Sequence, residues 1–342
     1  MTLTLETNTT PADEWDAFVH QAKGGTACHM AGWRDVLGTV FGHDCRYLAA
    51  RDAHGSLAGI LPLVRVRSVL FGHYLVSMPY LNYGGPLGSE AAVRLLAANA
   101  TEMATAGRVK RLELRSRIEL PLDIPVSHRK ITVVLDLQPG DPDAVFKGFD
   151  AKLRSQVRRP RKEGVVVRFG RDQVEPFYRV FARHMRDLGT PVMPRAYFEA
   201  IADRLGETAW FAVAWLGSEP VACGAGFRWG EEVEITWASS LRAHSRISPN
   251  MGLYWAFIER ACLEGMRLFN FGRCTPGSTT HRFKSQWGTR DESLWWYGVS
   301  RHAEAGTPSP TDGAYAWGPR LWRRLPERVA TALGPRIVRG IP

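Results

Sequence analysis

The order of strands and helices predicted from the sequence repeats on either side of a polar Pro/Gly break at 139–143. Before the break, a hairpin with its turn at 52–56 leads through a glycine-rich loop to a helix and two more strands. After it, a hairpin across 217–220 leads to a strand, a helix from Pro249 and a strand at 268–271. Two such cycles in the same order predict an internal duplication of one α/β fold.

The same break sets the predicted domain boundaries, because a polar stretch rich in Pro and Gly is typical of a linker. We predict domains over 1–138 and 139–305, followed by a linker and basic tail over 306–342. Residues 307–310 form the predicted linker, and 321–338 mixes Arg with apolar residues at helical spacing. This helix lies either on an anionic membrane surface or against the protein's own body.

Composition narrows the partners and the compartment. Lys and Arg number 44 against 34 Asp and Glu, and the net charge of +10 favours phosphorylated or nucleotide-linked small molecules, RNA or an acidic membrane face. The five cysteines are scattered without a CxxC pair, so neither disulfides nor a metal site is expected. Neither a signal peptide nor a run of about 18 apolar residues is recognisable. We therefore expect a cytoplasmic protein without a transmembrane segment.

The segment 267–297 gives the strongest indication of a binding site. Its buried strand ends at Gly272 and is followed by a polar loop, after which Arg282, Lys284 and Trp287 come in close succession. Cations beside glycine and aromatic residues after a core strand are typical of a site for an anionic ligand. A basic surface hairpin with its aromatic side chains turned inward is the alternative.

A helix N-terminus is the second candidate anion site. Ser248 directly before Pro249 predicts a hydroxyl cap and a helix start, and Asn250 adds a polar side chain there. The free N–H groups at such a start favour a phosphate or carboxylate. Any strand-to-helix crossover has this form, so an ordinary structural connection stays open.

The strand at 232–239 carries a candidate catalytic carboxylate. Alternation places Glu234 and Thr236 on one face of the strand, and Ile235 and Trp237 on the other. Glu234 can act as a general base if burial raises its pKa. A structural ion pair with a neighbouring arginine is the alternative.

Two more segments carry polar groups suited to binding. Arg154 and Arg158 share one face of a predicted basic helix over 144–163, where they can clamp a diphosphate or remain a solvated face. Asn82 and Tyr83 precede paired glycines, which permit close backbone approach to a ligand or simply form a tight turn. No GxGxxG, P-loop or GxSxG motif occurs, which argues against a dinucleotide cofactor, NTP hydrolysis and a serine triad.

These segments together resemble the FemAB-like transferases over about residues 10–300, and most closely the subgroup found with exosortase (PEP-CTERM) and exopolysaccharide gene sets. The matching segments are PYLNYGGPLG (79–88), LRSQVRRPRKEGV (153–165), MRDLGTPVMP (185–194), ITWASSLR (235–242), SPNMGLYW (248–255) and FNFGRCTPGSTTHRFKSQWG (269–288). The glycine–arginine step and RFKSQWG are the most specific part.

The resemblance implies an α/β (α+β) protein of two tandem GNAT-like acyltransferase domains, with mixed sheets flanked by helices. It implies acyl or aminoacyl transfer to an amine or hydroxyl of a cell-envelope, exopolysaccharide or peptidoglycan-type precursor. The donor would be aminoacyl-tRNA or acyl-CoA, with no tightly bound cofactor. The positions that it maps to the cleft are Asn82, Tyr83, Arg154, Arg158, Trp237, Asn250, Tyr254, Arg273, Lys284 and Trp287.

We therefore predict an acyltransferase in which Glu234 removes a proton and Lys284 stabilises the oxyanion, with the other cleft residues binding substrate. The chain departs from the family in two ways: it lacks a long heptad arm, which puts that style of tRNA docking in doubt, and a Q/RxxGxG/A loop, which weakens acetyl-CoA as donor. A CoA-dependent N-acetyltransferase and a non-catalytic nucleic-acid-binding or scaffold module stay open as alternatives. Peripheral contact with the inner membrane face would run through the tail.

Overall fold

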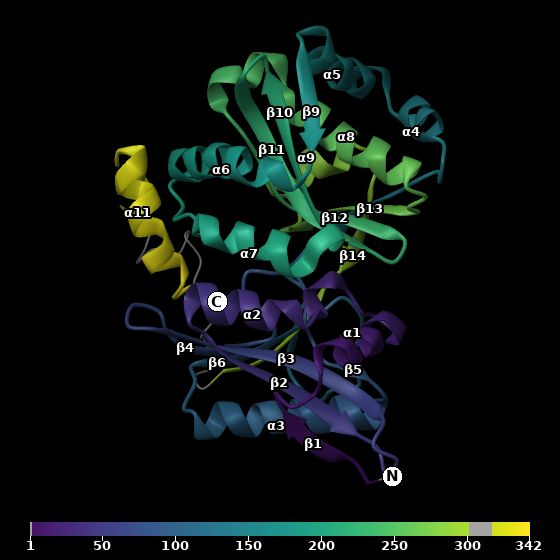
Figure 1. The fold of residues 1–342 in the computed structure, drawn as a ribbon, viewed down its shortest axis with the longest axis vertical. Helices are drawn as coiled ribbons and strands as arrows, with labels where there is room; N and C mark the ends of the chain where they lie inside the picture. The colour runs from purple at the N-terminus through teal and green to yellow at the C-terminus, as the bar shows by residue number, and fades with distance from the viewer. Residues whose placement is uncertain (1, 301–316) are drawn as a thin grey trace. The chain divides into compact units, whose positions relative to one another are not determined.

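A computed structural model describes residues 2–300 and 317–342 of the chain (Figure 1), which divide into two compact units. The first unit contains residues 2–129, 293–300 and 336–342, and the second contains residues 130–292 and 317–335. Each unit has one mixed β-sheet covered by helices, so the predicted α/β (α+β) fold with mixed sheets flanked by helices is confirmed.

The sheet of the first unit has the strand order β1-β2-β3-β4-β6-β15-β7, and β5 pairs with β3. Its strands are β1 (Thr4–Thr7), β2 (Asp44–Arg51), β3 (Leu57–Ser68), β4 (Gly72–Val76), β5 (Leu87–Gly88), β6 (Arg111–Ser116), β7 (Val126–Ser127) and β15 (Trp295–Ser300). Its helices are α1 (Ala12–Gln21), the short η1 (Ala27–His29), α2 (Gly32–Phe41) and α3 (Glu90–Ala106). Ser89 caps α3 as predicted, because its Oγ accepts the Ala92 N–H.

The sheet of the second unit has the order β14-β8-β13-β12-β11-β10-β9. Its strands are β8 (Ile131–Asp136), β9 (Val165–Phe169), β10 (Ala209–Leu216), β11 (Glu219–Trp229), β12 (Glu232–Ser240), β13 (Leu268–Cys274) and β14 (Arg290–Ser293). Its helices are α4 (Pro142–Gly148), α5 (Ala151–Lys162), α6 (Val174–Leu188), α7 (Arg195–Leu205), α8 (Pro249–Leu263) and α9 (Thr279–Ser285), with short turns η2 (Arg171–Gln173), η3 (Gly206–Thr208) and η4 (Arg242–Ile247).

The two sheets share one arrangement of strands. In the first, β4 and β6 are parallel and joined through α3. In the second, β12 and β13 are parallel and joined through α8. Parallel neighbours need a crossover of this kind, whereas the other neighbours are joined as antiparallel pairs. The duplication predicted from element order is therefore visible as repeated topology.

One strand of each sheet lies on the far side of the domain boundary that the sequence predicts. β8 precedes the rest of the second unit and pairs antiparallel with β13, from Leu268 opposite Asp136 to Cys274 opposite Ile131. β15 follows that unit and pairs antiparallel with β6 of the first sheet. The structure thus divides at 129/130 and 292/293, whereas the sequence placed the boundary at 138/139. The Pro/Gly break that suggested 138/139 is instead the connection from β8 to α4.

The basic helix predicted over 144–163 is two helices, α4 and α5. The chain breaks at Phe149, and the Asp150 carboxylate accepts the Leu153 N–H at 2.7 Å, which starts α5 anew. The predicted tail helix is likewise two, α10 (Trp317–Trp322) and α11 (Glu327–Val338), with Pro326 between them. The predicted linker at 307–310 lies outside the described residues.

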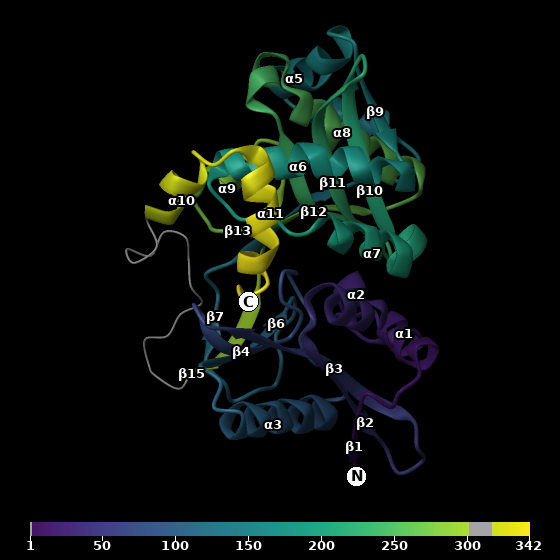
Figure 2. The ribbon, with the colours of Figure 1, turned by 60° about the vertical axis from the view of Figure 1, so that its left-hand side comes forward.

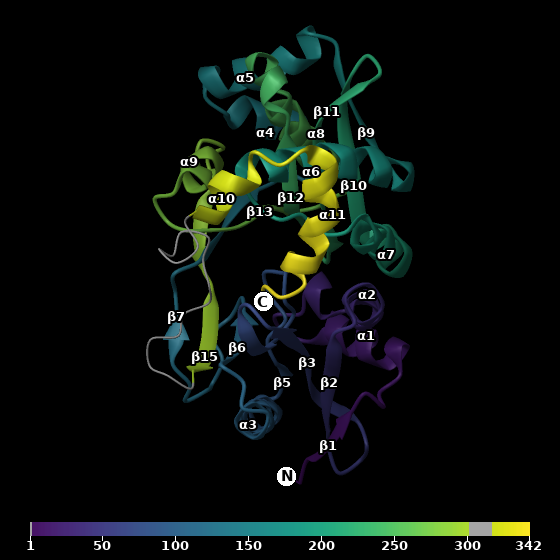
Figure 3. The same cartoon turned by 90° about the vertical axis from the view of Figure 1, so that its left-hand side faces the viewer.

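Helix α11 docks on the second unit beside α6 (Figure 2, Figure 3). Ala330 is buried, and a Cβ added at Gly334 would lie 2.8 Å from the Val192 backbone nitrogen, so the helix backbone approaches the protein closely here. Val329 and Leu333 remain partly exposed. Two alternatives were predicted for the tail helix, a membrane surface or the protein's own body. The face of α11 that contains Ala330 and Gly334 packs on the protein's own body. Among the described residues, no helix has the length and apolarity needed to cross a bilayer.

Candidate functional site

The centre of the second sheet opens where β12 and β13 stop pairing. In the described chain their parallel ladder covers three pairs and ends at Glu234 opposite Asn270, although both strands continue beyond it. We call the residues around this point the strand fork: Glu234, Asn270, Gly272, Arg273 and Lys284. Strands that separate in this way leave main-chain groups available for something other than the ladder.

A β-bulge in β12 lies directly beside the fork. Ile235 pairs with Gly226 and Trp237 with Ala225, so Thr236 is the extra residue. A bulge of this kind reverses the alternation of side chains beyond it. The predicted sharing of one face by Ile235 and Trp237 is therefore wrong.

The contacts confirm that these two side chains lie on opposite faces of the sheet. Ile235 lies on the α8 face: a Cβ added at Gly224 would meet both its Cδ1 and the Phe257 ring. The Trp237 ring packs edge-on against Phe198 of α7 at 5.4 Å. Trp237 is thus part of an aromatic cluster with α7, and its predicted role in substrate binding stays a prediction.

Glu234 is held in a buried polar network. It is 7% exposed, and its Oε1 accepts the Thr236 hydroxyl at 3.1 Å. The side-chain amide of Asn270 donates to Glu232 at 2.8 Å and reaches Glu234 Oε2 at 3.5 Å. The Thr132 hydroxyl from β8 donates to Asn270 Oδ1. The carboxylate is therefore oriented by Thr236 of its own strand and by Asn270 of β13, which Thr132 of β8 holds in turn. The alternative role of Glu234 in an ion pair with an arginine stays a prediction.

Lys284 is the second buried charge at the fork. Its side chain is 4% exposed, and Nζ donates to the carbonyl of Gly272 at 2.6 Å and to that of Arg273 at 2.9 Å. Gly272 has φ +72° at a register shift between β13 and β8, a conformation that turns its carbonyl out of the ladder. Burial lowers the Lys284 pKa to about 8, with Cys274 and Glu234 opposing the shift. The amine is thus mainly charged at neutral pH.

Tyr254 and Trp287 belong to an aromatic cluster around Phe271 of β13. Tyr254 stacks on Phe271 at 5.4 Å, and burial raises the pKa of its hydroxyl, which stays neutral. Trp287 is fully buried and lies 5.8 Å from the Phe271 ring. Its indole N–H is buried and has no hydrogen-bond partner among the described residues. Trp287 therefore supports the fork from the core and offers a ligand no exposed surface in this structure.

The start of α8 differs from the prediction in one respect. The helix runs Pro249–Leu263, as expected, but Ser248 adopts a left-handed conformation with φ 51° and its hydroxyl makes no capping bond. The predicted hydroxyl cap is therefore wrong. The Ser248 carbonyl instead accepts the Met251 N–H at 2.9 Å. Asn250 is half-buried in the first helical turn.

The two arginines of α5 have separate roles. Arg154 Nη1 donates to the carbonyl of Lys147 at 3.2 Å and to that of Phe149, so it joins the end of α4 to α5. Arg158 lies over the Phe146 ring at 4.9 Å and lines a pocket of about 680 Å³ between α5, β9 and α8. Arg154 thus bonds within the protein while Arg158 lines the pocket, and the predicted clamp of a ligand by both arginines stays a prediction.

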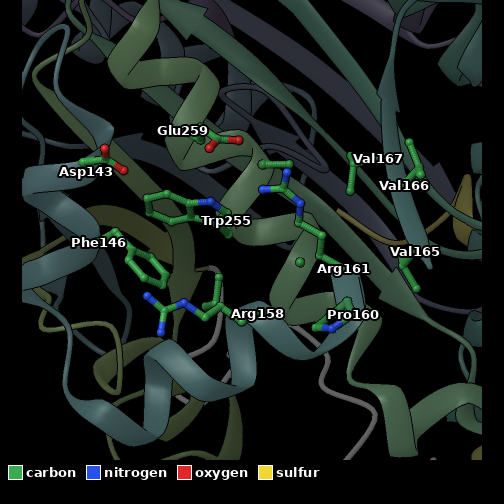
Figure 4. Close-up of a pocket in the computed structure, with 13 residues that line it drawn as sticks. Asp143, Phe146, Arg158, Pro160, Arg161, Val165, Val166, Val167, Trp255 and Glu259 are labelled. Atoms are coloured by element: carbon green, nitrogen blue, oxygen red, sulfur yellow. The ribbon is translucent and has the colours of Figure 1, made fainter. Parts of the chain in front are cut away.

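This α5–α8 pocket contains residues that the sequence reasoning missed. Trp255 packs against Phe146 at 5.0 Å, and Figure 4 shows the two rings side by side next to Arg158. Arg161 and Glu259 also line the pocket. The sequence contained a sign of this pocket, because Trp255 and Glu259 are four residues apart and therefore lie on one face of the helix. The Phe149 ring lies between Trp255 and Trp287, at 5.9 and 5.5 Å, so aromatic core connects the pocket to the fork.

Asn82 and Tyr83 lie in a rigid loop of the first unit. Both are buried, and two residues of the loop, Met78 and Tyr80, have positive φ values of 58° and 71°. Positive φ at residues other than glycine is uncommon and persists where the surroundings enforce it. Arg117 lies over the Tyr83 ring at 5.8 Å. The two predicted binding residues thus belong to the first unit, and their predicted role in substrate binding stays a prediction.

A buried ion pair between Arg115 and Glu113 supports this loop. Arg115 is almost fully buried and its Nε donates to Glu113 at 2.8 Å. Its Nη1 donates to the carbonyls of Met78 and Leu81, at 3.3 and 3.0 Å. His29 contacts the Gly85 carbonyl through Nε2 at 3.0 Å, and burial lowers its pKa to about 4.

The comparisons with known proteins agree with this fold. A family model described as acetyltransferase (GNAT) domain matches residues 147–285, which contain most of the second sheet and Lys284. Among solved structures, FemX covers 86% of this chain and 97% of its own at 16% identity and a TM-score of 0.62. L-PGS from Bacillus licheniformis covers 92% and 98% at 13% identity, with a TM-score of 0.55. A tandem GNAT protein from the clavulanic acid biosynthesis pathway covers 89% and 100% at 14% identity, with a TM-score of 0.54.

The comparison with curated proteins found no match. By sequence, only the match of residues 147–285 to an acetyltransferase (GNAT) domain was found. At these identities, the similarity of the whole chain to FemX and the tandem GNAT protein concerns the fold.

Proposed function

We propose that the protein is an acyl- or aminoacyltransferase that modifies an amine or hydroxyl of a cell-envelope or exopolysaccharide precursor. The observation that carries the proposal is the buried Lys284 ammonium beside the buried Glu234 carboxylate, where β12 and β13 separate. The GNAT domain match over the same strands supports acyl transfer as the reaction class. A buried titratable group whose pKa is shifted and which has a charged neighbour is a candidate for a functional site.

The proposed step is direct attack on a thioester or ester carbonyl. The acceptor nitrogen or oxygen bonds to the carbonyl carbon, and the carbon–sulfur or carbon–oxygen bond to the donor breaks. Glu234, or a water that it holds, takes the acceptor's proton and passes it to the leaving thiolate or alkoxide of the donor. An ammonium has three N–H groups, of which two donate to the Gly272 and Arg273 carbonyls. The third is available for the oxyanion of the tetrahedral intermediate.

The arginines would bind the phosphate groups of the substrates. Arg158, with Trp255 and Arg161 in the α5–α8 pocket, pairs cations with an aromatic face, an arrangement suited to a nucleotide-type group. Arg273, which is part of the strand fork, would bind a phosphate there. Arg154 acts as a positioning residue that holds α4 to α5.

The donor is the open part of the proposal. The GNAT match favours acyl-CoA, whereas the resemblance to FemAB-like enzymes favours aminoacyl-tRNA. Titration calorimetry with acetyl-CoA, coenzyme A and a charged tRNA separates these donors. A non-catalytic nucleic-acid-binding module predicts instead that RNA binds with a steep salt dependence and that no acyl donor binds.

Replacement of Lys284 tests the proposal. We expect Lys284→Met to lower the transfer rate by at least about a hundredfold, because an oxyanion donor typically contributes that much. Lys162→Met, on the exposed end of α5, is the matched control and should keep the wild-type rate. Thermal unfolding of both variants reports whether the fold is intact. Near-normal transfer by a folded Lys284→Met protein would contradict the proposed site.

A further inference from the structure

The turn between β3 and β4 carries the most exposed apolar side chains among the described residues. Val69 is fully exposed and Leu70 is 71% exposed. Phe71 follows directly, and the two strands lie side by side in the first sheet (Figure 1). Adjacent large apolar side chains at a hairpin tip cost hydration free energy in water, so such a tip usually has an apolar partner.

A basic pocket lies at the base of the same hairpin. It has a volume of about 260 Å³ and is lined by Arg65 and Arg67 of β3, Arg339, Asp44, His43 and Gly42. Arg65 and Arg67 are two residues apart on one strand, so they share a face. Three arginines therefore line one small cavity, and two of them, Arg65 and Arg67, are two to five residues from the apolar tip in the sequence.

The single carboxylate in the pocket does not neutralise these cations. Asp44 Oδ1 accepts the Arg46 Nε at 2.8 Å, and its Oδ2 lies 4.0 Å from the Arg65 Nε. That Arg65 nitrogen is buried and has no hydrogen-bond partner in the described part of the chain. A buried donor without an acceptor, beside other guanidinium groups, favours an added anion.

The pocket is built from fixed parts. The Tyr80 hydroxyl donates to the Arg339 carbonyl at 3.0 Å and lies 2.8 Å from His43 Nε2. A Cβ added at Gly340 would lie 2.8 Å from Ser68 Cβ, so the segment with Arg339 packs closely on the end of β3. The arginines and the hairpin tip are therefore positioned together.

We propose that this hairpin docks the protein on an anionic phospholipid bilayer, with Val69 and Leu70 inserted among the acyl chains and a lipid phosphate bound by Arg65, Arg67 and Arg339. An apolar tip next to a cluster of cations matches the two layers of an anionic membrane surface, where the phosphates lie just above the hydrocarbon. A free phosphate or an RNA would use the arginines and leave the tip in water. The proposal is independent of the transferase reaction and differs from membrane contact through the tail helix.

Vesicle sedimentation tests the docking surface. We expect the wild-type protein to bind vesicles with about 30 mol% phosphatidylglycerol and to bind pure phosphatidylcholine vesicles at least about tenfold more weakly. Val69→Asn/Leu70→Asn and Arg65→Gln/Arg67→Gln should each lower the affinity for the anionic vesicles by at least about tenfold. Val166→Asn/Leu263→Asn, at exposed apolar positions of the second unit, is the matched control and should bind as the wild type does.

A probe at the tip separates insertion from charge attraction alone. The five native cysteines are free and buried, so Leu70→Cys offers an accessible thiol for an environment-sensitive fluorophore. We expect a blue-shifted emission with anionic vesicles for a label at position 70 and none for a label on Leu263→Cys. Absence of vesicle binding, unchanged binding by the tip variant, or loss only on Leu321→Asn/Leu333→Asn in the tail would overturn the proposal. So would binding to RNA in place of vesicles.

Discussion

At the scale of single residues, Lys284 and His29 show how burial tunes a charge. Both side chains lie in the protein interior, and desolvation is the largest cause of the lowered pKa in each. Neither shift could be read from the sequence, because His29 carries no motif and Lys284 stands in a polar segment. Lys284 is buried because its ammonium bonds to the carbonyl at the turn of Gly272. His29 is buried because its ring contacts the Gly85 carbonyl in the loop that also contains Asn82 and Tyr83.

Lys284 makes stability and activity depend on alkaline pH. Its pKa is about 8 in the folded protein and near 10.5 in an exposed lysine, so between these values the unfolded chain binds more protons. We therefore expect the free energy of unfolding to rise with pH across this window, by up to roughly 3 kcal/mol. The transfer rate should instead fall above pH 8, as the ammonium is lost. Urea unfolding at pH 7.5 and 10 measures the change in the free energy of unfolding. The Lys284→Met variant should lack the rise in this free energy.

His29 makes stability depend on acid pH in the opposite range. Its pKa of about 4 lies below the ordinary value of 6.5, so the unfolded state binds more protons between these values. Stability should be fully present above pH 6.5 and fall by up to roughly 3 kcal/mol as the pH approaches 4. Urea unfolding of the wild type and of His29→Gln over this range measures it. An equal loss in both proteins would show that His29 is not responsible.

At the scale of elements, the sequence predicted the regular parts and missed the irregular ones. The parallel strand at 268–271, the helix from Pro249 and the hairpin from Leu57 follow from apolar periodicity and turn residues, and each is present. The bulge at Thr236 leaves no periodic signal, because an extra residue reads as ordinary alternation. The single polar residue in the apolar run Phe269–Phe271 was a usable sign of the role of Asn270.

The break between α4 and α5 depends on one cap. Asp150 accepts the Leu153 N–H at 2.7 Å, and the new helix direction places Arg158 in the pocket. We expect Asp150→Ala to lower the free energy of unfolding by about 1 kcal/mol, the usual contribution of a carboxylate cap. Asp143→Ala, within the first turn of α4, is the control that should change stability less. Chemical denaturation of the three proteins decides between a true cap and an incidental contact.

The Thr132 bond to Asn270 joins β8 to the fork. Thr132→Val keeps the shape of the side chain but leaves the Asn270 oxygen with one partner fewer, so we expect a loss of about 1–2 kcal/mol. Activity should fall more than this stability loss explains, because Glu234 loses the orientation of its neighbour. Thr101→Val, at a half-buried helix position in the first unit, is the matched control. Equal activities of the two variants would contradict the network.

At the scale of the whole molecule, the duplicated fold was predictable from the sequence. The pairing of β8 with the second sheet and of β15 with the first sheet was not. Element order gave two α/β cycles, but the partner of β13 was set by pairing across the chain, which a local pattern does not record. For the same reason, the sequence predicted correctly only that site residues close to one another in the chain lie together. Arg273 and Lys284, for example, meet at the strand fork. Asn82 and Tyr83 belong to the first unit.

The pairing of β8 with β13 predicts which fragment of the second unit can fold. A fragment of residues 130–293 contains all strands of the second sheet, whereas one of residues 139–293 lacks β8 and exposes the edge of β13. We expect cooperative thermal unfolding from the first and aggregation or non-cooperative unfolding from the second. Equal cooperativity in both would show that β8 is dispensable.

The central claim is that Glu234 and Lys284 serve the same reaction at the strand fork. A cycle of Glu234→Gln, Lys284→Met and the double variant, measured as single-turnover acyl transfer with the donor that calorimetry identifies, tests it most directly. If the two act in one transition state, each single change should lower the rate by at least about a hundredfold, and the double variant should be little slower than the worse single variant. Near-wild-type transfer by either folded single variant would contradict the claim.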